Sequence, residues 1–319
     1  MISVLLATYN GEKYLKKQLN SLLNQTYKDF EIIIRDDGST DSTNDIIEDF
    51  KNRYPDKIKV ITGAPTGSSK GNFFELLAAC PSGYAMLCDQ DDFWCEEKIA
   101  KTFSKMLEKE TECGVDTPVL VHCDAYVADE NLNVISESFI EYQAISPEFK
   151  RLNNLLVQNN LTGCTCMINN ALLKLLRIKP ESCVMHDWWI ALTACLFGET
   201  VFINEPLMYY RQHGDNQVGA KNARGMDYLV TKYKNRKQVV SNYRAAYAQA
   251  NALLKAFSDR MTPEQKKLVS VYAAMPRLNK FERIRAINKY SFKKNTLIRT
   301  VVFFSLATIR PVYRFLYTG

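Results

Sequence analysis

The first half of the chain alternates short apolar runs, rich in β-branched residues, with amphipathic stretches of helical length. Such alternation is typical of a mainly parallel sheet whose connecting helices cover its faces. It therefore predicts an α/β fold. The expected strands are residues 2–7, 31–35, 58–62, 84–88 and 119–122, and the expected helices are residues 12–23, 42–51, 72–80 and 96–108.

Three of the expected strand ends carry polar clusters: Thr8-Tyr9-Asn10-Gly11, Asp36-Asp37-Gly38-Ser39 and Asp89-Gln90-Asp91-Asp92. In open α/β sheets, ligands bind beside the carboxyl ends of the strands. We therefore expect the three clusters to meet in one site. After about residue 125 the pattern is mixed, with a strand pair or excursion at 125–136 and further strands at 201–203 and 207–211.

Asp89, Asp91 and Asp92 place three carboxylates within four residues, directly after an apolar run. Like charges this close repel each other and raise one another's pKa. A divalent metal that bridges a diphosphate would relieve the repulsion and assist the leaving group. The alternative is a solvated turn in which Asp92 caps the next helix; the position at a central strand end favours the metal site.

The other two clusters suit a nucleoside. A carboxylate of Asp36 or Asp37 could accept a hydrogen bond from a pyrimidine imide or from ribose, and Tyr9 could hold the base. The alternatives are an ordinary Asp-Gly turn with a helix cap at Asp41 or Ser42, and a half-buried Tyr9 without a ligand.

Two later segments also carry chemistry. In His186-Asp187-Trp188-Trp189 we expect a helix that begins at the acid and leaves one tryptophan partly exposed, suited to stack on a sugar beside a carboxylate base. In residues 210–216, Arg211 suits a diphosphate and His213 a metal or phosphate. The alternatives are a helix cap at Asp187 and a structural histidine.

Taken in order, these five segments resemble the GT-A fold inverting glycosyltransferases of family 2, over residues 1 to about 216. The resemblance implies that Thr8, Tyr9, Asn10, Asp36, Asp37, Asp89, Gln90 and Arg211 bind the donor, that Asp91, Asp89 and His213 bind Mn²⁺ or Mg²⁺, that Asp187 is the general base, and that Trp188 and Trp189 contact the acceptor. Family members often have Glu before the base, where this chain has His186, so the role of that preceding position is open.

The forms DQDDFW and YRQHGDN are most similar to bacterial rhamnosyltransferases of polysaccharide assembly, which implies dTDP-L-rhamnose as donor. A UDP-hexose or UDP-N-acetylhexosamine donor is the main alternative, and a non-catalytic nucleotide-sugar-binding scaffold is another. A nicotinamide-dependent dehydrogenase is disfavoured because no GxGxxG follows the first strand. The expected partners are the nucleotide-sugar and a lipid-linked saccharide acceptor, and no nucleic acid is expected.

The charge of the chain is concentrated at its end. Residues 266–319 contain twelve Lys/Arg and one acid, a net +11, so the overall charge of +6 leaves −5 for the rest. With the apolar run 301–309, too short to span a bilayer, this basic tail is expected to lie on an anionic membrane surface. A helix packed on the protein or in a homodimer interface is the alternative.

The remaining expectations concern organisation and compartment. We divide the chain into a catalytic domain (1–216), a helical extension (217–265) and the basic helical tail (266–319), with a helix start at Thr262-Pro263-Glu264-Gln265. The first apolar run is expected to be a buried strand rather than a signal peptide. The nine scattered cysteines lack paired CxxC spacing and predict buried thiols in a reducing cytoplasm, at the inner face of the cell membrane.

Overall fold

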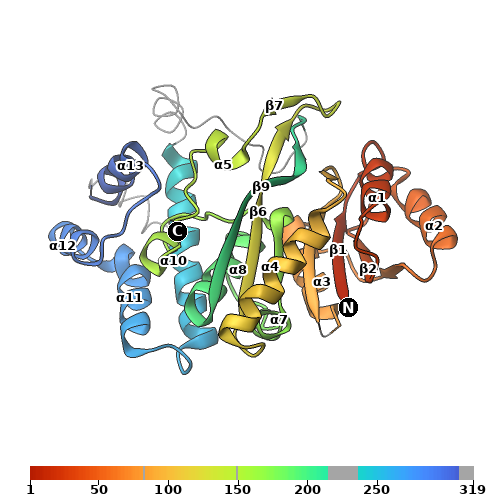
Figure 1. Cartoon of the computed structure of the whole chain (residues 1–319). Coiled ribbons are helices and arrows are strands. Elements are labelled where there is room, and N and C mark those ends of the chain that lie inside the picture. The colour runs from red at the N-terminus through yellow and green to blue at the C-terminus, as the bar shows by residue number, and fades with distance from the viewer. Residues whose placement is uncertain (82, 149, 215–235, 309–319) are drawn as a thin grey trace. The chain divides into compact units, whose positions relative to one another are not determined.

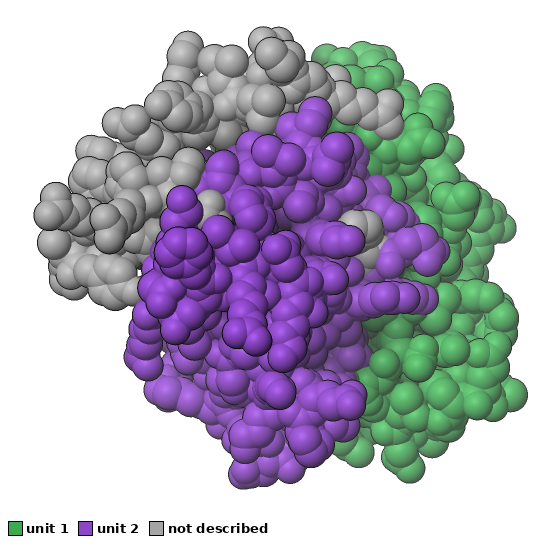
Figure 2. All heavy atoms as spheres, turned by 90° about the vertical axis from the view of Figure 1, so that its left-hand side faces the viewer, with its two compact units in different colours: residues 1–142, 161–177, 197–221 green, residues 143–160, 178–196, 222–319 purple. Residues whose placement is uncertain are grey.

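The computed structural model describes residues 1–81, 83–148, 150–214 and 236–308. The chain divides into two compact units, coloured separately in Figure 2. Unit 1 comprises Met1–Tyr142, Leu161–Arg177 and Phe197–Lys221, and unit 2 comprises Gln143–Asn160, Ile178–Leu196 and Asn222–Gly319. Each unit is therefore assembled from segments that are not consecutive in the sequence.

Unit 1 is built around one mixed sheet (Figure 1). Its described strands follow the order β3-β2-β1-β4-β8-β6-β9-β5, and β7 pairs with β6. The first four are mutually parallel, whereas β8 runs antiparallel to both of its neighbours. The bounds are β1 Ile2–Thr8, β2 Phe30–Asp36, β3 Ile58–Ile61, β4 Tyr84–Asp89, β5 Phe93–Trp94, β6 Val119–Ala128, β7 Val134–Ser136, β8 Cys166–Ile168 and β9 Glu199–Arg211.

The central strands and their helices agree with the predicted alternation. All seven residues of β1 are buried, as expected for a strand covered on both faces. In α1 the buried leucines Leu15, Leu19 and Leu22 follow helical spacing and form one apolar face. The helices of unit 1 are α1 Leu15–Leu23, α2 Thr43–Arg53, α3 Ser69–Ala79, α4 Lys98–Cys113, α5 Phe139–Tyr142, α7 Asn170–Leu176 and the 3₁₀ turn η1 Gly163–Thr165.

The extent of strand β9 and its pairing with β6 differ from the prediction. The two strands expected at 201–203 and 207–211 are one strand, β9, which runs parallel to β6. The register between them shifts on both sides of Asp124, which lies opposite Pro206. Proline has no backbone N–H for the ladder, so an irregularity at this point lets the strand continue past it.

Unit 2 is helical in its described part. Its helices are α6 Leu152–Leu155, α8 His186–Phe197, α10 Arg236–Phe257, α11 Pro263–Ala274, η2 Met275–Arg277, α12 Lys280–Tyr290 and α13 Leu297–Thr308. The predicted start of α11 is confirmed, because Thr262 and Gln265 form a capping box. Phe257, Tyr272 and Phe292 are fully buried and supply aromatic contacts to its core.

The predicted domain boundaries at 216/217 and 265/266 stay predictions. Residues 217–235 of the expected extension and 309–319 of the expected tail lie outside the described residues, and the boundary at 265/266 falls inside α11. All nine cysteines are free and six are buried, in line with small apolar side chains. Among the described helices, none is both long and apolar enough to cross a bilayer.

Candidate active site

Parallel pairing brings the carboxyl ends of β1, β2 and β4 to one edge of the sheet in unit 1. Thr8 is paired with Asp36, and Ala7 with Asp89. The three polar clusters predicted to form one site therefore follow neighbouring strands. Hydrogen bonds between their loops connect them further.

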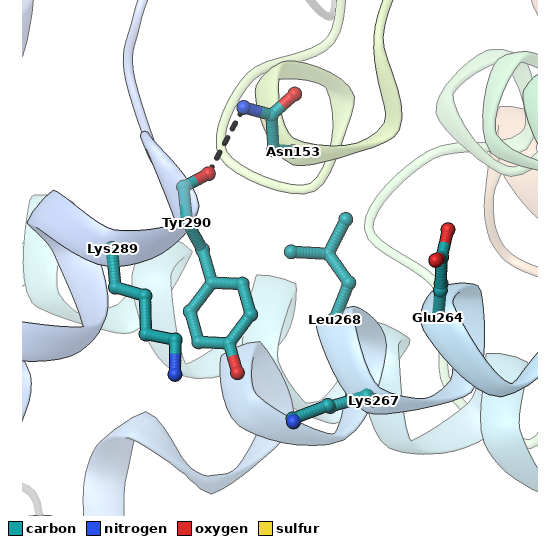
Figure 3. Close-up of a pocket in the computed structure, with 6 residues that line it drawn as sticks. All are labelled: Asn153, Glu264, Lys267, Leu268, Lys289 and Tyr290. Atoms are coloured by element: carbon teal, nitrogen blue, oxygen red, sulfur yellow. Dashed lines mark hydrogen bonds between the residues drawn. The ribbon is translucent and has the colours of Figure 1, made fainter.

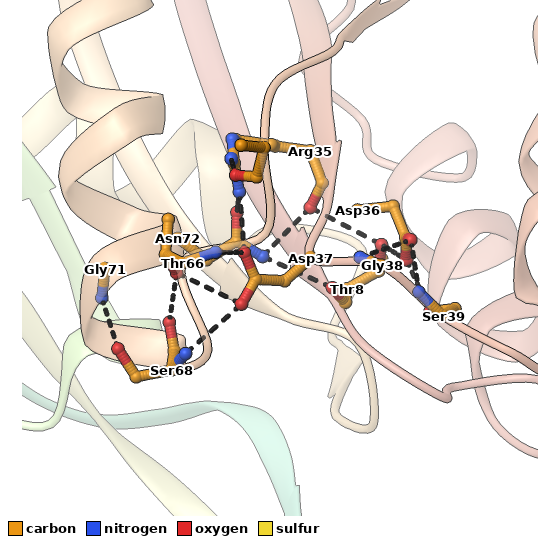
Figure 4. Close-up of polar contacts among 11 residues, drawn as sticks. Thr8, Arg35, Asp36, Asp37, Gly38, Ser39, Thr66, Ser68, Gly71 and Asn72 are labelled. Atoms are coloured by element: carbon orange, nitrogen blue, oxygen red, sulfur yellow. Dashed lines mark hydrogen bonds and ion pairs between the residues drawn. The ribbon is translucent and has the colours of Figure 1, made fainter.

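Asp36 closes the turn after β2 (Figure 4). One carboxylate oxygen accepts hydrogen bonds from the hydroxyls of Thr8 (2.9 Å) and Ser39 (2.5 Å), and the other from the backbone N–H groups of Gly38 (3.0 Å) and Ser39 (2.7 Å). Gly38 has a φ of 89°, and a Cβ there would lie 2.8 Å from the Pro65 ring. The turn thus requires glycine at position 38, and the Asp36 carboxylate stabilises the turn through hydrogen bonds within the chain.

Asp37 is buried, and its oxygens accept four hydrogen bonds: from Arg35 Nη1 (2.9 Å), Thr66 N (2.7 Å), Thr66 Oγ1 (3.0 Å) and Ser68 N (3.2 Å) (Figure 4). Burial alone raises the pKa of Asp37, but the hydrogen bonds from Thr66 and Arg35 outweigh it and hold the pKa below its usual value. A carboxylate offers about four acceptor positions. A nucleoside could bind Asp37 only in place of one of these contacts.

Gln90 connects the loop after β1 to the acidic loop after β4. Its Oε1 accepts a hydrogen bond from Tyr9 N, and its Nε2 donates to Tyr9 O, both at 2.8 Å. A Cβ at Gly11 would lie 2.3 Å from Gln90 Oε1, so this arrangement requires glycine there. The Tyr9 side chain is left 56% exposed at the sheet edge, and Asn10, at a φ of 48°, accepts from Thr40 N.

Asp92 differs from the other acids of its cluster. It is 1% exposed, and its Oδ2 has no hydrogen-bond partner in the described part of the chain. Burial, followed by the charges of Asp91 and Asp89, raises its pKa well above the usual value. Ligand atoms of Asp89, Asp92 and Cys164 lie within 4.8 Å of one another. Asp89 and Asp92 are called the inner acidic group below.

The donor set of this loop fits a hard divalent cation through its carboxylates. Carboxylate oxygens are the ligands that Mg²⁺ and Mn²⁺ prefer, whereas a thiol favours softer metals. Burial raises the pKa of Cys164 well above its usual value, and its sulfur is the only soft atom of the three. The buried Asp92 oxygen without a partner is what a cation beside Asp89 would satisfy.

Asp91 and His213, two of the predicted metal ligands, are in contact. His213 Nε2 lies 2.8 Å from Asp91 Oδ2, and both side chains stay partly exposed, at 11% and 17%. The His213 ring also packs on Tyr14, with ring centroids 4.8 Å apart. His213, two residues after β9, therefore places an imidazole beside Asp91, which follows β4.

Arg211 is placed differently from the prediction of a diphosphate contact. Its side chain is fully buried, with Nε donating to Asp91 O (2.6 Å) and Nη1 to Glu130 O (2.5 Å). Its guanidinium also lies 4.7 Å from the centre of the Tyr14 ring. As the last residue of β9, Arg211 points into the protein and supports the acidic loop from behind, and its contact with a diphosphate stays a prediction.

Lys98 is a residue that the sequence analysis missed. It is fully buried, donates to Cys164 O (2.5 Å) and lies 3.5 Å from the centre of the Trp94 ring. Its positive charge acts on Asp92 and thus balances part of the inner acidic group. A sequence signal existed, because Lys98 shares the buried face of α4 with Thr102 and Met106 at four-residue spacing.

Asp187, Trp188 and Trp189 belong to unit 2, where they begin helix α8. Asp187 is partly exposed, and its Oδ1 accepts from Trp188 N (2.6 Å). The prediction that one tryptophan stays exposed is wrong. Trp188 is buried and donates to Leu155 O (2.6 Å), and Trp189 is fully buried against Phe257. The reason is that α8 is apolar around nearly its whole circumference and lies inside unit 2.

The buried His186 is expected to make the stability of the protein sensitive to acid. Burial lowers its pKa from 6.5 to about 3. In the unfolded chain His186 takes up a proton near pH 6.5, whereas in the folded chain it does so only near pH 3. The folded state is therefore not penalised above about pH 6.5 and loses stability as the pH falls toward 3. Near pH 4.5 the loss in the free energy of unfolding is about 2–3 kcal/mol. We expect the melting temperature of the native chain to fall more between pH 7 and 4.5 than that of His186→Gln. Equal losses would contradict this.

Comparison with known proteins identifies the family of the chain. The model of the glycosyl transferase family 2 matches residues 3–174. The chain belongs to glycosyltransferase family 2. The matched range contains the three clusters at the strand ends, as well as Lys98 and Cys164.

Curated relatives agree with this membership. The dTDP-rhamnosyl transferase RfbG of Shigella flexneri is 29% identical over 227 residues, which cover 67% of this chain and 74% of that protein. An uncharacterised glycosyltransferase of Nostoc sp. is 30% identical over 222 residues, covering 67% of this chain and 66% of that protein.

Among solved structures, TarS 1–349 of S. aureus in complex with UDP has a TM-score of 0.57 at 18% identity, covering 98% of this chain and 82% of that one. A mannosyltransferase of Pyrobaculum calidifontis in complex with GDP-Man and Mn²⁺ has a TM-score of 0.54 at 13% identity, covering 99% and 82%. At these identities the likeness concerns the fold alone. The predicted GT-A fold is confirmed.

Proposed function

We propose that this family 2 glycosyltransferase moves a sugar from a nucleotide-diphospho-sugar to a saccharide acceptor, with inversion at the anomeric carbon. The observation that carries the proposal is the sheet edge of unit 1. There Asp89 ends β4 and Asp91 follows it, and Gln90 between them binds the loop of the exposed Tyr9. A ring at this edge suits a nucleoside, and acids with a divalent cation suit a diphosphate.

The donor is assigned to residues of these loops. Thr8, Tyr9 and Asn10 would hold the nucleoside, and Asp89 and Gln90 would lie beside the diphosphate. Asp36 and Asp37 would contribute to donor binding by holding the adjacent loops in position. Their hydrogen bonds are formed within the chain itself, so the loops need little reorganisation when the donor binds.

The proposed donor is dTDP-L-rhamnose. Support comes from the relative RfbG, named a dTDP-rhamnosyl transferase, and from the similarity of DQDDFW and YRQHGDN to rhamnosyltransferases. A UDP-hexose or UDP-N-acetylhexosamine is the alternative, since TarS has been solved with UDP-GlcNAc.

Metal binding is assigned to Asp91, Asp89 and His213. Mn²⁺ or Mg²⁺ bound there would supply positive charge to the departing diphosphate. Arg211 holds the backbone carbonyl of Asp91, and Lys98 lies behind the inner acids. Both are positioning residues in this proposal, because they act through the acidic loop.

Asp187 is the proposed general base. It would accept the proton of the acceptor hydroxyl as that oxygen bonds to the anomeric carbon, while the bond from this carbon to the diphosphate oxygen breaks on the opposite face. A single displacement of this kind inverts the configuration. The N-terminal end of α8 favours the ionised carboxylate, and its partial exposure leaves it accessible.

The proposed acceptor is a lipid-linked saccharide of a capsule or cell-wall polysaccharide, reached at the inner face of the cell membrane. Helix α13 supports a membrane-facing role, because Leu297, Ile298 and Val301 are 80%, 46% and 58% exposed. On its other face, the buried Arg299 donates to the carbonyl oxygens of Gln143 and Ala144. A homodimer interface at this face is the alternative.

A panel of nucleotide sugars tests the donor assignment. With Mn²⁺ present, dTDP-L-rhamnose is expected to raise the melting temperature of the protein and to be hydrolysed slowly, because donor binding stabilises the folded state. Stabilisation by UDP-glucose, UDP-galactose or a UDP-N-acetylhexosamine instead would replace the donor but keep the reaction class. No response to any member of the panel would contradict the proposed function itself.

A further inference from the structure

A hollow of about 380 Å³ lies on unit 2, between α6, α11 and the end of α12 (Figure 3). Its lining residues are Asn153, Glu264, Lys267, Leu268, Lys289 and Tyr290. It lies within unit 2 and takes no part in the donor site proposed above.

The end of α12 is fixed in place beside the hollow. Asn153 Nδ2 donates to the carbonyl oxygens of Tyr290 and Ser291, both at 3.0 Å. Ser291 ends the helix with a φ of 51°, and the following Phe292 is fully buried. The carbonyl groups that would repel an anion at this helix end are therefore partly satisfied by Asn153.

The charges that face the hollow favour an anion. In Figure 3 the ammonium groups of Lys267 and Lys289 and the hydroxyl of Tyr290 lie toward the same end of the hollow. No ion pair joins Lys267 or Lys289 to a described residue, although Glu264 also lines the hollow, and Lys289 Nζ lies 5.7 Å from the centre of the Tyr290 ring. Two cationic donors and one hydroxyl thus remain available, with Leu268 as an apolar side.

We propose that this hollow binds a phosphate group, supplied by the headgroup of an anionic membrane lipid. Two ammonium groups and a phenol suit the oxygens of a phosphate, with which lysine interacts as a point charge. The proposal deepens the proposed function by naming the partner that holds the enzyme at the membrane, and it rests on that function for its placement there. The alternative source of the same chemistry is a free phosphate ion.

Exposed apolar side chains of the same helices support the lipid source. Helix α12, whose last residues line the hollow, carries Phe281 in its first turn, where it is 80% exposed, and α13 exposes Leu297 and Val301. These two helices contact each other within unit 2. A phosphate site together with exposed aromatic and aliphatic side chains is the combination expected of a surface that binds a lipid headgroup layer.

Vesicle binding of the full chain tests the site. Co-sedimentation would use phosphatidylcholine vesicles with increasing phosphatidylglycerol, comparing Lys267→Gln/Lys289→Gln with Lys266→Gln/Lys293→Gln. The control pair is exposed, lies outside the hollow and removes the same charge. We expect both to bind more weakly than the native chain, and the hollow variant to bind at least about tenfold more weakly than the control. Equal binding of the two variants would overturn the lipid assignment.

Two further measurements complete the test. Tyr290→Phe keeps the ring and removes only the hydroxyl, so it is expected to weaken vesicle binding without the risk of a large charge change. Inorganic phosphate, compared with chloride at equal ionic strength, should raise the melting temperature of the native chain but not of the hollow variant. A phosphate response with equal vesicle binding of the two lysine pairs assigns the hollow to free phosphate.

Absence of both responses would reject the site. Neither readout uses a nucleotide sugar or turnover. A failure here therefore leaves the donor panel unaffected, and a failure of the donor panel leaves the vesicle result standing.

Discussion

Asp91→Asn is expected to lower the rate of sugar transfer by at least about 100-fold. The substitution removes one negative charge from the proposed metal site and breaks the contact of Asp91 Oδ2 with His213 Nε2. A 100-fold loss corresponds to about 2.7 kcal/mol of transition-state stabilisation, which is reasonable for a ligand of a catalytic metal. Release of the nucleoside diphosphate measures the rate. Chelation should likewise abolish transfer, and Mn²⁺ or Mg²⁺ should restore it.

Asp116→Asn is the matched control for this experiment. Asp116 is exposed and precedes β6, which runs in the same direction as β4, so it lies at the opposite edge of the sheet from Asp91. Its substitution is expected to leave the rate unchanged. Full turnover by metal-stripped protein would contradict metal dependence, whatever the rate of Asp91→Asn.

Asp187→Asn is expected to abolish transfer while leaving the affinity for the donor nearly unchanged. A base acts in the transition state rather than in the ground state, so its loss lowers kcat without weakening the binding of the donor. The amide oxygen of asparagine can still accept the hydrogen bond from Trp188 N, so the start of α8 should be preserved. Calorimetry with the donor and a transfer assay separate the two effects.

The control is Glu181→Gln, which removes an exposed acid shortly before α8. Glu181 pairs with Lys255 at the surface, with both side chains more than 60% exposed, so its loss should have little effect. Near-native transfer by Asp187→Asn would contradict the base assignment. Retention of the donor's anomeric configuration in the product would contradict the single displacement.

Local pattern was sufficient for the strands β1, β2 and β4 and for the meeting of the three polar clusters. The alternation predicted β1, β2 and β4, and parallel pairing then placed Thr8 beside Asp36 and Ala7 beside Asp89. These results need only the period of the apolar residues and the geometry of parallel sheets.

Side-chain partners distant in the sequence could not be predicted. Lys98 reaches the carbonyl of Cys164, 66 positions away, and Arg211 reaches that of Asp91, 120 positions away. Neither contact has a local signature, since each depends on which strands become neighbours in the sheet. The burial of Trp188 and Trp189 was missed for a similar reason, because helix α8 is enclosed by segments from elsewhere in the chain.

The pairing of Gln90 with the backbone of Tyr9 has a consequence for how this site can change over evolutionary time. The side chain of Gln90, between Asp89 and Asp91, occupies the space that a Cβ at Gly11 would need, since that Cβ would lie 2.3 Å from Gln90 Oε1. A shorter side chain at 90 would lift the restriction at 11, and a larger residue at 11 would displace the Gln90 amide from its two hydrogen bonds with Tyr9. The two positions should therefore covary among homologues, 79 residues apart in sequence.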